Sequence, residues 1–264
     1  MTTSIRASSL PELFDCPARW ESKHIKGMRT PSSGAAVLGK AVHAGTGAFD
    51  SARLLGSPVT ADEAAAAAVD AIYKPDEDVV WGDDKPKTAE QIAVSLHKKY
   101  CAGVALEIDY TAVEAKCDSL TIADLGITLT GTIDRVYRDS DGLLGIADLK
   151  TGKTAVSADG SVKTQGHGLQ LATYELLAEV AIGESILADA QIIGMQTGVT
   201  DKAQRIGVGR ISSPRDALIG TSEFPGALQH ASKFLKSGLF YGNPRSQLCG
   251  EKFCPIFKNC QFRK

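Results

Sequence analysis

Residues 131–153 read GTIDRVYRDSDGLLGIADLKTGK, and they hold the most informative pattern in this 264-residue chain. Two β-branched, apolar runs flank the turn sequence DSDG at positions 139–142, so the stretch predicts a β-hairpin. A three-residue loop closed by Gly142 in the left-handed conformation is a common hairpin geometry. In that register Asp134 lies directly opposite Asp148, with both carboxylates on one face of the sheet.

The two acids and the lysine that follows them predict a metal site. Like charges directly opposite each other destabilise an ordinary sheet, and a divalent cation with oxygen ligands relieves the repulsion between Asp134 and Asp148. The side chain of Lys150 projects from the same face of the sheet. An ammonium group in that place stabilises the negative charge that develops on a phosphate under attack. The alternative is a solvent-facing pair of acids with an ordinary strand-end lysine, but Val136 and Ile146 make that face partly apolar. A one-residue slip in register sends the carboxylates to opposite faces.

The segments on both sides of the hairpin predict an α/β (α+β) fold. Helical spacing or capping signals occur at 8–20, 34–55, 64–68, 88–107, 166–182 and 226–237. Short, β-branched, turn-bounded segments predict strands at 110–117, 120–123, 128–138, 143–150, 187–197 and 203–209. This order predicts a single domain over residues 1–264, with a helical insertion at about 56–108.

The composition predicts an intracellular protein with one large core. Hydrophobic residues make up 43% of the chain, no apolar run approaches the roughly 18 residues of a membrane span, and the start lacks a signal-peptide layout. We therefore expect a cytoplasmic location and no membrane partner. The net charge of −2 gives no overall sign of a nucleic-acid partner, but residues 226–264 hold seven Lys/Arg against one Glu. Such a local basic face binds phosphate, and a solvated surface is the equal alternative.

Three of the six cysteines, Cys249, Cys254 and Cys260, crowd the C-terminus, while Cys16 stands alone near the N-terminus. Clustered cysteines in an intracellular protein indicate a metal more often than disulfides. Zinc sites use four nitrogen or sulfur ligands, and a [4Fe–4S] cluster uses four thiolates. The C-terminal triple therefore lacks one ligand, and Cys16 is the candidate to complete the set.

Ile133-Asp134 followed by Asp148-Leu149-Lys150 resembles the motif of PD-(D/E)XK nucleases, and the run GTIDRV…IADLKTGK resembles their RecB-like branch. That branch includes CRISPR-associated exonucleases and many phage exonucleases. The resemblance implies a restriction-endonuclease-like αβββαβ core with a mixed central sheet. It also implies metal-dependent cleavage of DNA phosphodiester bonds.

The resemblance further implies a set of metal ligands. In this branch a histidine on an upstream helix completes the metal site, often after a glycine-containing stretch, and His43 in LGKAVH fits that pattern. By this resemblance Asp134, Asp148, the backbone carbonyl of Leu149 and His43 hold Mg²⁺ or Mn²⁺. Lys150 then assists the attack of water on the phosphorus.

Five other positions bear on the site. Gln170 and Tyr174 match the Q-x-x-x-Y of the family on one helix face, which implies a role in orienting the scissile strand or the lysine; an ordinary amphipathic helix is the alternative. His167, just before that helix, is the rival metal-ligating histidine. Glu114 lies in the strand before the hairpin, where we expect a surface acid, with metal ligation as the lesser alternative. Arg135 points away from its acidic neighbour and is expected to be structural.

Several RecB-like nucleases resemble this chain in combining one N-terminal cysteine with three C-terminal ones around an iron–sulfur cluster. By that resemblance Cys16, Cys249, Cys254 and Cys260 hold a [4Fe–4S] cluster, which clamps position 16 to the tail at 249–260. The four-residue gap after Cys249 departs from the shorter gap common in the relatives. Zinc is the lesser alternative, and free or disulfide-bonded cysteines are the third.

The resemblance predicts a DNA exonuclease that digests single-stranded DNA or free DNA ends in recombination, repair or DNA processing. Recombination or helicase proteins are the expected partners, and a bacterial or phage-infected cell is the expected setting. Three alternatives stay open: a non-cleaving nucleic-acid-binding recombination protein, a structure-specific endonuclease, and a zinc-dependent interaction module with surface acids. Intact Asp134, Asp148 and Lys150 count against the first.

Overall fold

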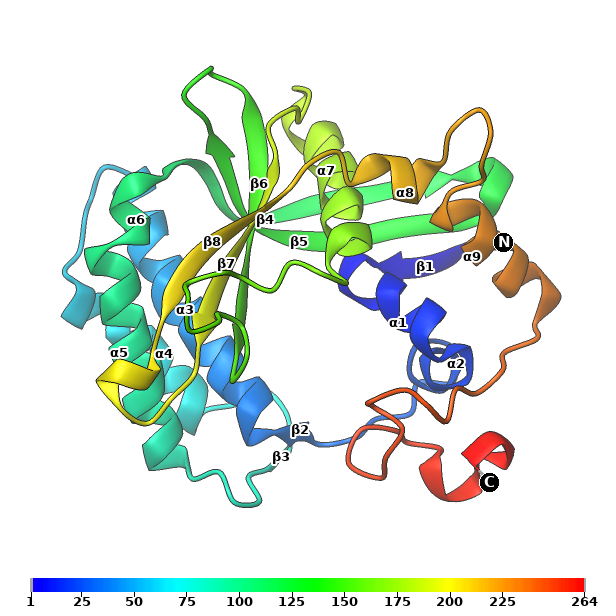
Figure 1. The fold of residues 1–264 in the computed structure, drawn as a ribbon, viewed down its shortest axis with the longest axis horizontal. Coiled ribbons are helices and arrows are strands. Elements are labelled where there is room, and N and C mark those ends of the chain that lie inside the picture. Colours follow the sequence, from blue (N-terminus) through cyan, green and yellow to red (C-terminus); the bar gives the residue numbers. More distant parts are fainter. Residues whose placement is uncertain (1, 264) are drawn as a thin grey trace.

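A mixed β-sheet runs through the centre of the protein, which the computed structural model describes over residues 2–263 (Figure 1). Within this range the six strands of the sheet are β1 (Thr3–Arg6), β4 (Asp109–Ile122), β5 (Ile127–Arg138), β6 (Leu144–Gly152), β7 (Ala190–Gln196) and β8 (Ile206–Ile211). They follow the order β1-β5-β6-β7-β8, and β4 also pairs with β5. A separate parallel pair consists of β2 (Ser32–Ser33) and β3 (Val79–Val80).

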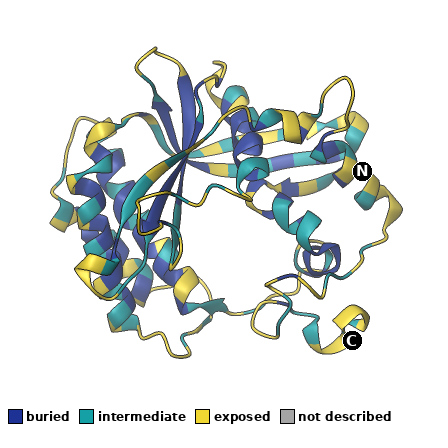
Figure 2. Ribbon diagram, in the orientation of Figure 1, coloured by how far each residue is buried: buried dark blue, intermediate teal, exposed yellow. Residues whose placement is uncertain are grey.

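Helices cover both faces of this sheet. They are α1 (Leu10–Asp15), α2 (Pro17–His24), α3 (Gly34–Leu54), α4 (Ala61–Tyr73), α5 (Pro86–Ala102), α6 (Val104–Glu107), α7 (Gly168–Ile182), α8 (Arg215–Ile219) and α9 (Ala227–Ser237). Neighbouring residues of β7 divide between two hydrophobic cores, because Ile192 belongs to the core under α7 and Ile193 to the core under α3. Buried residues accordingly follow the central strands, while exposed residues follow the loops (Figure 2).

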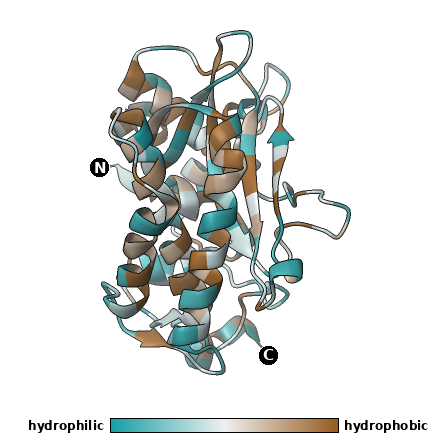
Figure 3. Ribbon diagram, turned by 90° about the vertical axis from the view of Figure 1, so that its left-hand side faces the viewer, coloured by the Kyte–Doolittle hydropathy of each residue, from teal (hydrophilic) through white to brown (hydrophobic). Residues whose placement is uncertain are grey.

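The order α3, β4, β5, β6, α7, β7 is αβββαβ, which confirms the predicted restriction-endonuclease-like core. α4 and α5 pack against α3, and the side of the molecule that they form mixes hydrophilic and hydrophobic residues (Figure 3). None of the helices within residues 2–263 has both the length and the apolarity needed to cross a membrane.

The hairpin of β5 and β6 has the register predicted from its turn. β5 pairs Arg135 with Ala147 and Arg138 with Leu144. Gly142 has φ 81°, the left-handed conformation, and the backbone N–H of Asp139 donates to the carbonyl of Leu143 at 3.0 Å. The three-residue loop therefore sets which residues of the two strands face each other.

β5 and β6 separate at the two acids. β4 pairs with one edge of β5 along nearly its whole length, so β6 and β1 share the other edge. β6 pairs with residues 135–138 and β1 with residues 127–130, so in the described chain positions 131–134 of that edge pair with neither strand. Asp134 is thus the first residue beyond the hairpin ladder, and its Oδ2 atom accepts the backbone N–H of Leu149 at 2.8 Å. This fork opens the sheet where the sequence predicted a site.

Differences from the prediction include the following three elements. β4 is one strand where two were predicted, at 110–117 and 120–123, because an irregularity between Cys117 and Leu120 keeps both halves paired with β5. The predicted helix at 8–20 divides at Cys16, whose extended backbone (φ −148°, ψ 90°) separates α1 from α2. β1 was missed because its parallel partner, β5, is distant in the sequence.

Candidate functional site

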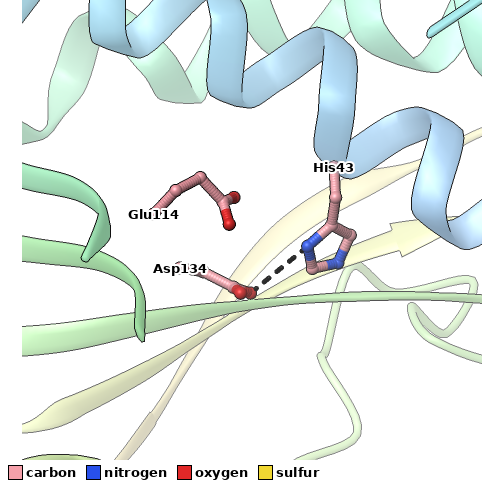
Figure 4. Close-up of side chains that lie close together, drawn as sticks. All are labelled: His43, Glu114 and Asp134. Atoms are coloured by element: carbon pink, nitrogen blue, oxygen red, sulfur yellow. Dashed lines mark ion pairs between the residues drawn. The ribbon is translucent and has the colours of Figure 1, made fainter. Parts of the chain in front are cut away.

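α3 carries His43 across the fork between β5 and β6 (Figure 4). The Nε2 atom of His43 lies 3.1 Å from the carbonyl oxygen of Leu149, and its Nδ1 atom lies 3.5 Å from Oδ2 of Asp134. Neighbouring ligands of an octahedral cation, each about 2.1 Å from the ion, lie about 3 Å apart. Nδ1 of His43 and the carboxylate of Asp134 therefore have nearly the spacing of two ligands of one divalent cation. Nε2, which faces the carbonyl of Leu149, cannot bind the same cation at the same time.

Glu114 of β4 joins this group, although the sequence favoured a surface acid at this position. Across residues 2–263, one ligand atom each from His43, Glu114 and Asp134 come within 4.8 Å of one another, and Figure 4 shows the two carboxylates facing the imidazole. Glu114 is 43% exposed and has φ 48°, a left-handed conformation that costs a non-glycine residue about 1–2 kcal/mol. The register of β4 against β5 aligns it with Asp134. Sequence reasoning held metal ligation by Glu114 as the lesser alternative, because backbone irregularities in β4 set that register.

Asp148 forms a buried ion pair with Lys150. The Nζ atom of Lys150 lies 2.5 Å from Oδ2 of Asp148, whose side chain is 3% exposed, and that oxygen has no hydrogen-bond partner besides this contact. Burial raises the pKa of Asp148 to about 6; Lys150 opposes the rise and the nearby Asp134 adds to it. Asp148 is thus buried at the fork, while the side chain of its partner Lys150 is 28% exposed and reaches toward solvent.

Gln170 and Tyr174 of α7 lie beside the same acid. The Nε2 atom of Gln170 is 3.4 Å from Oδ1 of Asp148 and 3.2 Å from Oη of Tyr174. The tyrosine ring packs on the backbone of Gly131, where an added Cβ would lie 2.9 Å from Cε1. The predicted Q-x-x-x-Y pair thus contacts the carboxylate of the hairpin, with glycine leaving room for the ring.

His167, the rival histidine, does not join the metal-type cluster found within residues 2–263. It stands at the N-terminus of α7. Burial, followed by the positive charges of Lys150 and Lys163, lowers the pKa of His167 to about 4. This histidine is therefore neutral near pH 7, and it lies close enough to Lys150 for the lysine's positive charge to disfavour its protonation.

Arg135 lies behind the cluster, fully buried against α3. Its Nε atom is 2.8 Å from Oδ2 of Asp50, and its Nη1 atom is 3.1 Å from Oε1 of Glu114. Asp50 follows His43 by seven residues, which is the spacing of one helix face. That spacing is a signal in the sequence for a polar residue facing the strands, and sequence reasoning did not use it.

A groove leads from solvent to the cluster. Its volume is about 610 Å³, and small residues of α3 form much of its wall together with the histidine and the acid of β4. The lining residues are Gly39, Lys40, His43, Ala44, Gly47, Ala48, Ser51 and Glu114. Because most of these side chains are short, an elongated ligand can approach the backbone of α3.

The four cysteines singled out in the sequence line one pocket, so the two ends of the chain meet there. The backbone N–H of Asn243 donates to Sγ of Cys16 at 3.4 Å. A tetrahedral zinc ion, with Zn–S of about 2.3 Å, holds its sulfur ligands about 3.8 Å apart, yet within residues 2–263 no three cysteine sulfurs come within 4.8 Å of one another. In a [4Fe–4S] cluster each thiolate binds a different iron atom, so the four sulfurs need not lie that close together.

A charged clamp borders the cysteine pocket. Arg19, which lines the pocket, lies 2.9 Å from Oε1 of Glu12, and Nζ of Lys23 lies 2.9 Å from Oε2. Burial favours the neutral acid, but hydrogen bonds from His24 and Lys23 and the nearby cationic charges lower the pKa of Glu12 to about 2. The carboxylate is therefore ionised in the folded protein and ties α1 to α2.

Known proteins include a family and solved structures that are similar to this chain. A family model described as the PD-(D/E)XK nuclease superfamily matches residues 4–261. None of the curated proteins matches the chain. The crystal structure of SSO0001 is 12% identical, with a TM-score of 0.47 over 100% of this chain and 88% of the other. A protein from Eubacterium rectale, provisionally named an exonuclease, is 15% identical, with a TM-score of 0.45 over 89% and 78% of the two chains.

Proposed function

The chain belongs to the PD-(D/E)XK nuclease superfamily, and from this membership we propose that it is an exonuclease that hydrolyses DNA at single-stranded or free ends. Nucleases of this superfamily use divalent metal ions. The observation that carries the proposal is the fork, where His43 and Asp134 lie at ligand spacing, the carbonyl of Leu149 lies beside the histidine, and the Asp148–Lys150 pair is next to them. We assign four ligands to the bound Mg²⁺ or Mn²⁺. They are His43, Asp134, Asp148 and the backbone carbonyl of Leu149.

The bound cation supplies positive charge that polarises the phosphate and stabilises the leaving oxygen. The ammonium group of Lys150, which is partly exposed, lies where it can donate to a phosphate oxygen or to the attacking water. Gln170, bonded to Tyr174, donates to Asp148 and so orients the carboxylate that the lysine contacts. In this mechanism the side chains bind the phosphate and restrict the positions of the reacting atoms. Such positioning supplies a large part of the rate enhancement.

We also propose that Cys16, Cys249, Cys254 and Cys260 hold a structural [4Fe–4S] cluster. The support for this proposal is that the four cysteines line one pocket and that, within residues 2–263, no three of their sulfurs lie within 4.8 Å of one another, as a tetrahedral zinc site requires. Protein purified without oxygen should be brown and contain iron and sulfide, and Cys16→Ser should lose both. Zinc without iron in the wild-type protein would overturn this assignment.

The remaining assignments follow from the proposed substrate. We propose that the protein acts in the cytoplasm with recombination or helicase proteins as partners. We further propose that residues 1–264 form a single nuclease domain in which 56–108 is a helical insertion, since α4 and α5 pack on α3. Met1 and Lys264, the ends of that range, lie outside the described residues.

The test compares linear and circular single-stranded DNA in Mg²⁺ or Mn²⁺. We expect the wild-type protein to shorten the linear strand and to leave the circle intact, and Asp148→Ala and Lys150→Ala to be inactive while folded. Asp118→Asn, an exposed acid on the same strand as Glu114, serves as the matched control and should cleave normally. Cutting of the circle would indicate an endonuclease, and full activity of either active-site variant would refute the assigned site.

A further inference from the structure

Glu114 is oriented by a fully buried arginine. Nη1 of Arg135 lies 3.1 Å from Oε1 of Glu114 and donates to the backbone carbonyl of Asp134 at 2.7 Å. One nitrogen thus holds the carboxylate of β4 against the main chain of β5. Because the side chain of Arg135 has no exposed surface, the position of this partly exposed carboxylate is set from inside the protein.

Arg135 does not require Glu114 to compensate its own charge. Its Nε atom lies 2.8 Å from Oδ2 of Asp50, which is fully buried on α3, and its Nη2 atom donates to Oγ1 of Thr46 at 3.3 Å. Tyr100 also donates to Asp50, at 2.6 Å. The guanidinium is therefore already paired, and Glu114 brings an additional negative charge toward Asp134.

Two of the four acids near the fork share cationic charge less closely than the others. Asp50 and Asp148 each have a cationic partner at 2.8 Å or less, in Arg135 and Lys150. Glu114 shares Arg135 with Asp50, at 3.1 Å, and the ion-pair contact of Asp134 is with His43, at 3.5 Å. Glu114 and Asp134 thus bring two carboxylates together, an arrangement that a divalent cation stabilises.

We propose that Glu114 is a further ligand of the divalent cation assigned to His43 and Asp134, and that Arg135, held by Asp50, positions it. The three ligand atoms lie within 4.8 Å of one another, and ligands on opposite sides of a cation with bonds of about 2.1 Å are about 4.2 Å apart. The acid packs against α3 at Gly47, where a Cβ would be in ordinary van der Waals contact with Cγ of Glu114, at 3.4 Å. This inference rests on the proposed metal site and adds to it a ligand from β4.

The alternative role for Glu114 is a structural partner of Arg135, and cation binding separates the two. Glu114→Gln keeps a carbonyl oxygen that accepts from Arg135 but removes the charged ligand. We expect its affinity for Mn²⁺, measured by electron paramagnetic resonance on cation-free protein without DNA, to fall about 10-fold or more. Asp118→Asn should bind Mn²⁺ like the wild-type protein. A folded Glu114→Gln variant whose Mn²⁺ affinity stays within twofold of the wild type overturns the inference.

The positioning role of Arg135 is tested by a double-mutant cycle. Lysine cannot reach both Glu114 and Asp50 with separate nitrogens, so Arg135→Lys should weaken Mn²⁺ binding in the wild-type background. In the Glu114→Gln background the same change should have little further effect, because the two residues act as one unit. An equal loss in both backgrounds shows that Arg135 does not act through Glu114. Asp50→Asn replaces Arg135→Lys in the cycle if the lysine variant does not fold.

The nuclease assay is read separately from Mn²⁺ binding. A wild-type protein that cleaves DNA, with a Glu114→Gln variant that binds Mn²⁺ normally, refutes this inference and leaves the nuclease proposal intact. Mn²⁺ binding that depends on Glu114 in a protein that cuts no DNA refutes the nuclease proposal and leaves the ligand assignment intact.

Discussion

Asp148→Asn should make the cation-free protein more stable while it abolishes activity. The carboxylate of Asp148 is buried, and burial raises its pKa from 3.8 to about 6 even with Lys150 beside it. Asparagine has nearly the same shape and keeps an oxygen for the hydrogen bond from Gln170. The substitution therefore removes an unfavourable buried charge and leaves the packing unchanged.

The magnitude follows from the shift in the pKa of Asp148. The folded protein holds the proton more tightly than the unfolded chain, so the free energy of unfolding falls as the pH rises from about 4 to about 6. A shift of about two units at about 1.36 kcal/mol each gives about 3 kcal/mol above pH 6. Asparagine loses the contact with Lys150, so we expect a gain of about 1–3 kcal/mol, or several degrees in Tm.

Urea denaturation of the cation-free protein between pH 4 and pH 7.5 measures the effect. The variant should be more stable than the wild type at pH 7.5, and the difference should shrink as the pH falls toward 4, where Asp148 is protonated in the folded protein and about half protonated in the unfolded chain. Asp118→Asn should show no such difference. Saturating Mn²⁺ should reverse the order, because a ligand at 100 times its Kd adds about 2.7 kcal/mol to the protein that binds it.

Two results would refute this reasoning. The first is that Asp148→Asn is less stable than the wild type at pH 7.5 without cations. The ion pair with Lys150 would then stabilise the fold by more than the burial of the Asp148 charge costs. If the variant is more stable by the same amount at every pH, the gain comes from packing and not from the ionisation of Asp148.

Other substitutions test the geometry around the site. Gly142→Val places a β-branched residue at φ 81°, so it should lower Tm and nuclease activity, while Gly142→Asn, which tolerates that conformation, should stay near the wild type; equal activity of both variants would show that the loop does not control the register. Gly131→Ala should displace the ring of Tyr174 and lower kcat with Mn²⁺ affinity unchanged, and a normal kcat would contradict the role of that contact. Glu12→Gln should destabilise the protein by about 2–3 kcal/mol at pH 7, because the pKa of this buried acid is lowered from 4.5 to about 2. The loss should shrink as the pH falls from about 4.5 toward 2, and urea denaturation that shows a constant loss would contradict it.

Local chemistry was enough to predict the hairpin and the order of the core elements. A turn closed by Gly142 allows few geometries, so the residue types around it determined the register of β5 and β6 before any packing was considered. Periodicity of apolar residues likewise predicted α3 and α7, which became the helices of the αβββαβ core. Local rules placed Asp134, Asp148 and Lys150 at this end of the hairpin, but not their final positions: Asp134 was predicted directly opposite Asp148, whereas the ladder ends at Arg135–Ala147 and the strands separate there.

Contacts between distant segments decided the rest of the site. The fork depends on β1, which pairs with the far half of β5 and leaves room beside Asp134. The sequence favoured a surface acid at Glu114, but irregular pairing of β4 and a buried Arg135 held by Asp50 bring it to the cluster. Each of these contacts joins residues far apart in the chain, so their geometry depends on how whole elements pack, and periodicity or turn chemistry along the chain does not specify it.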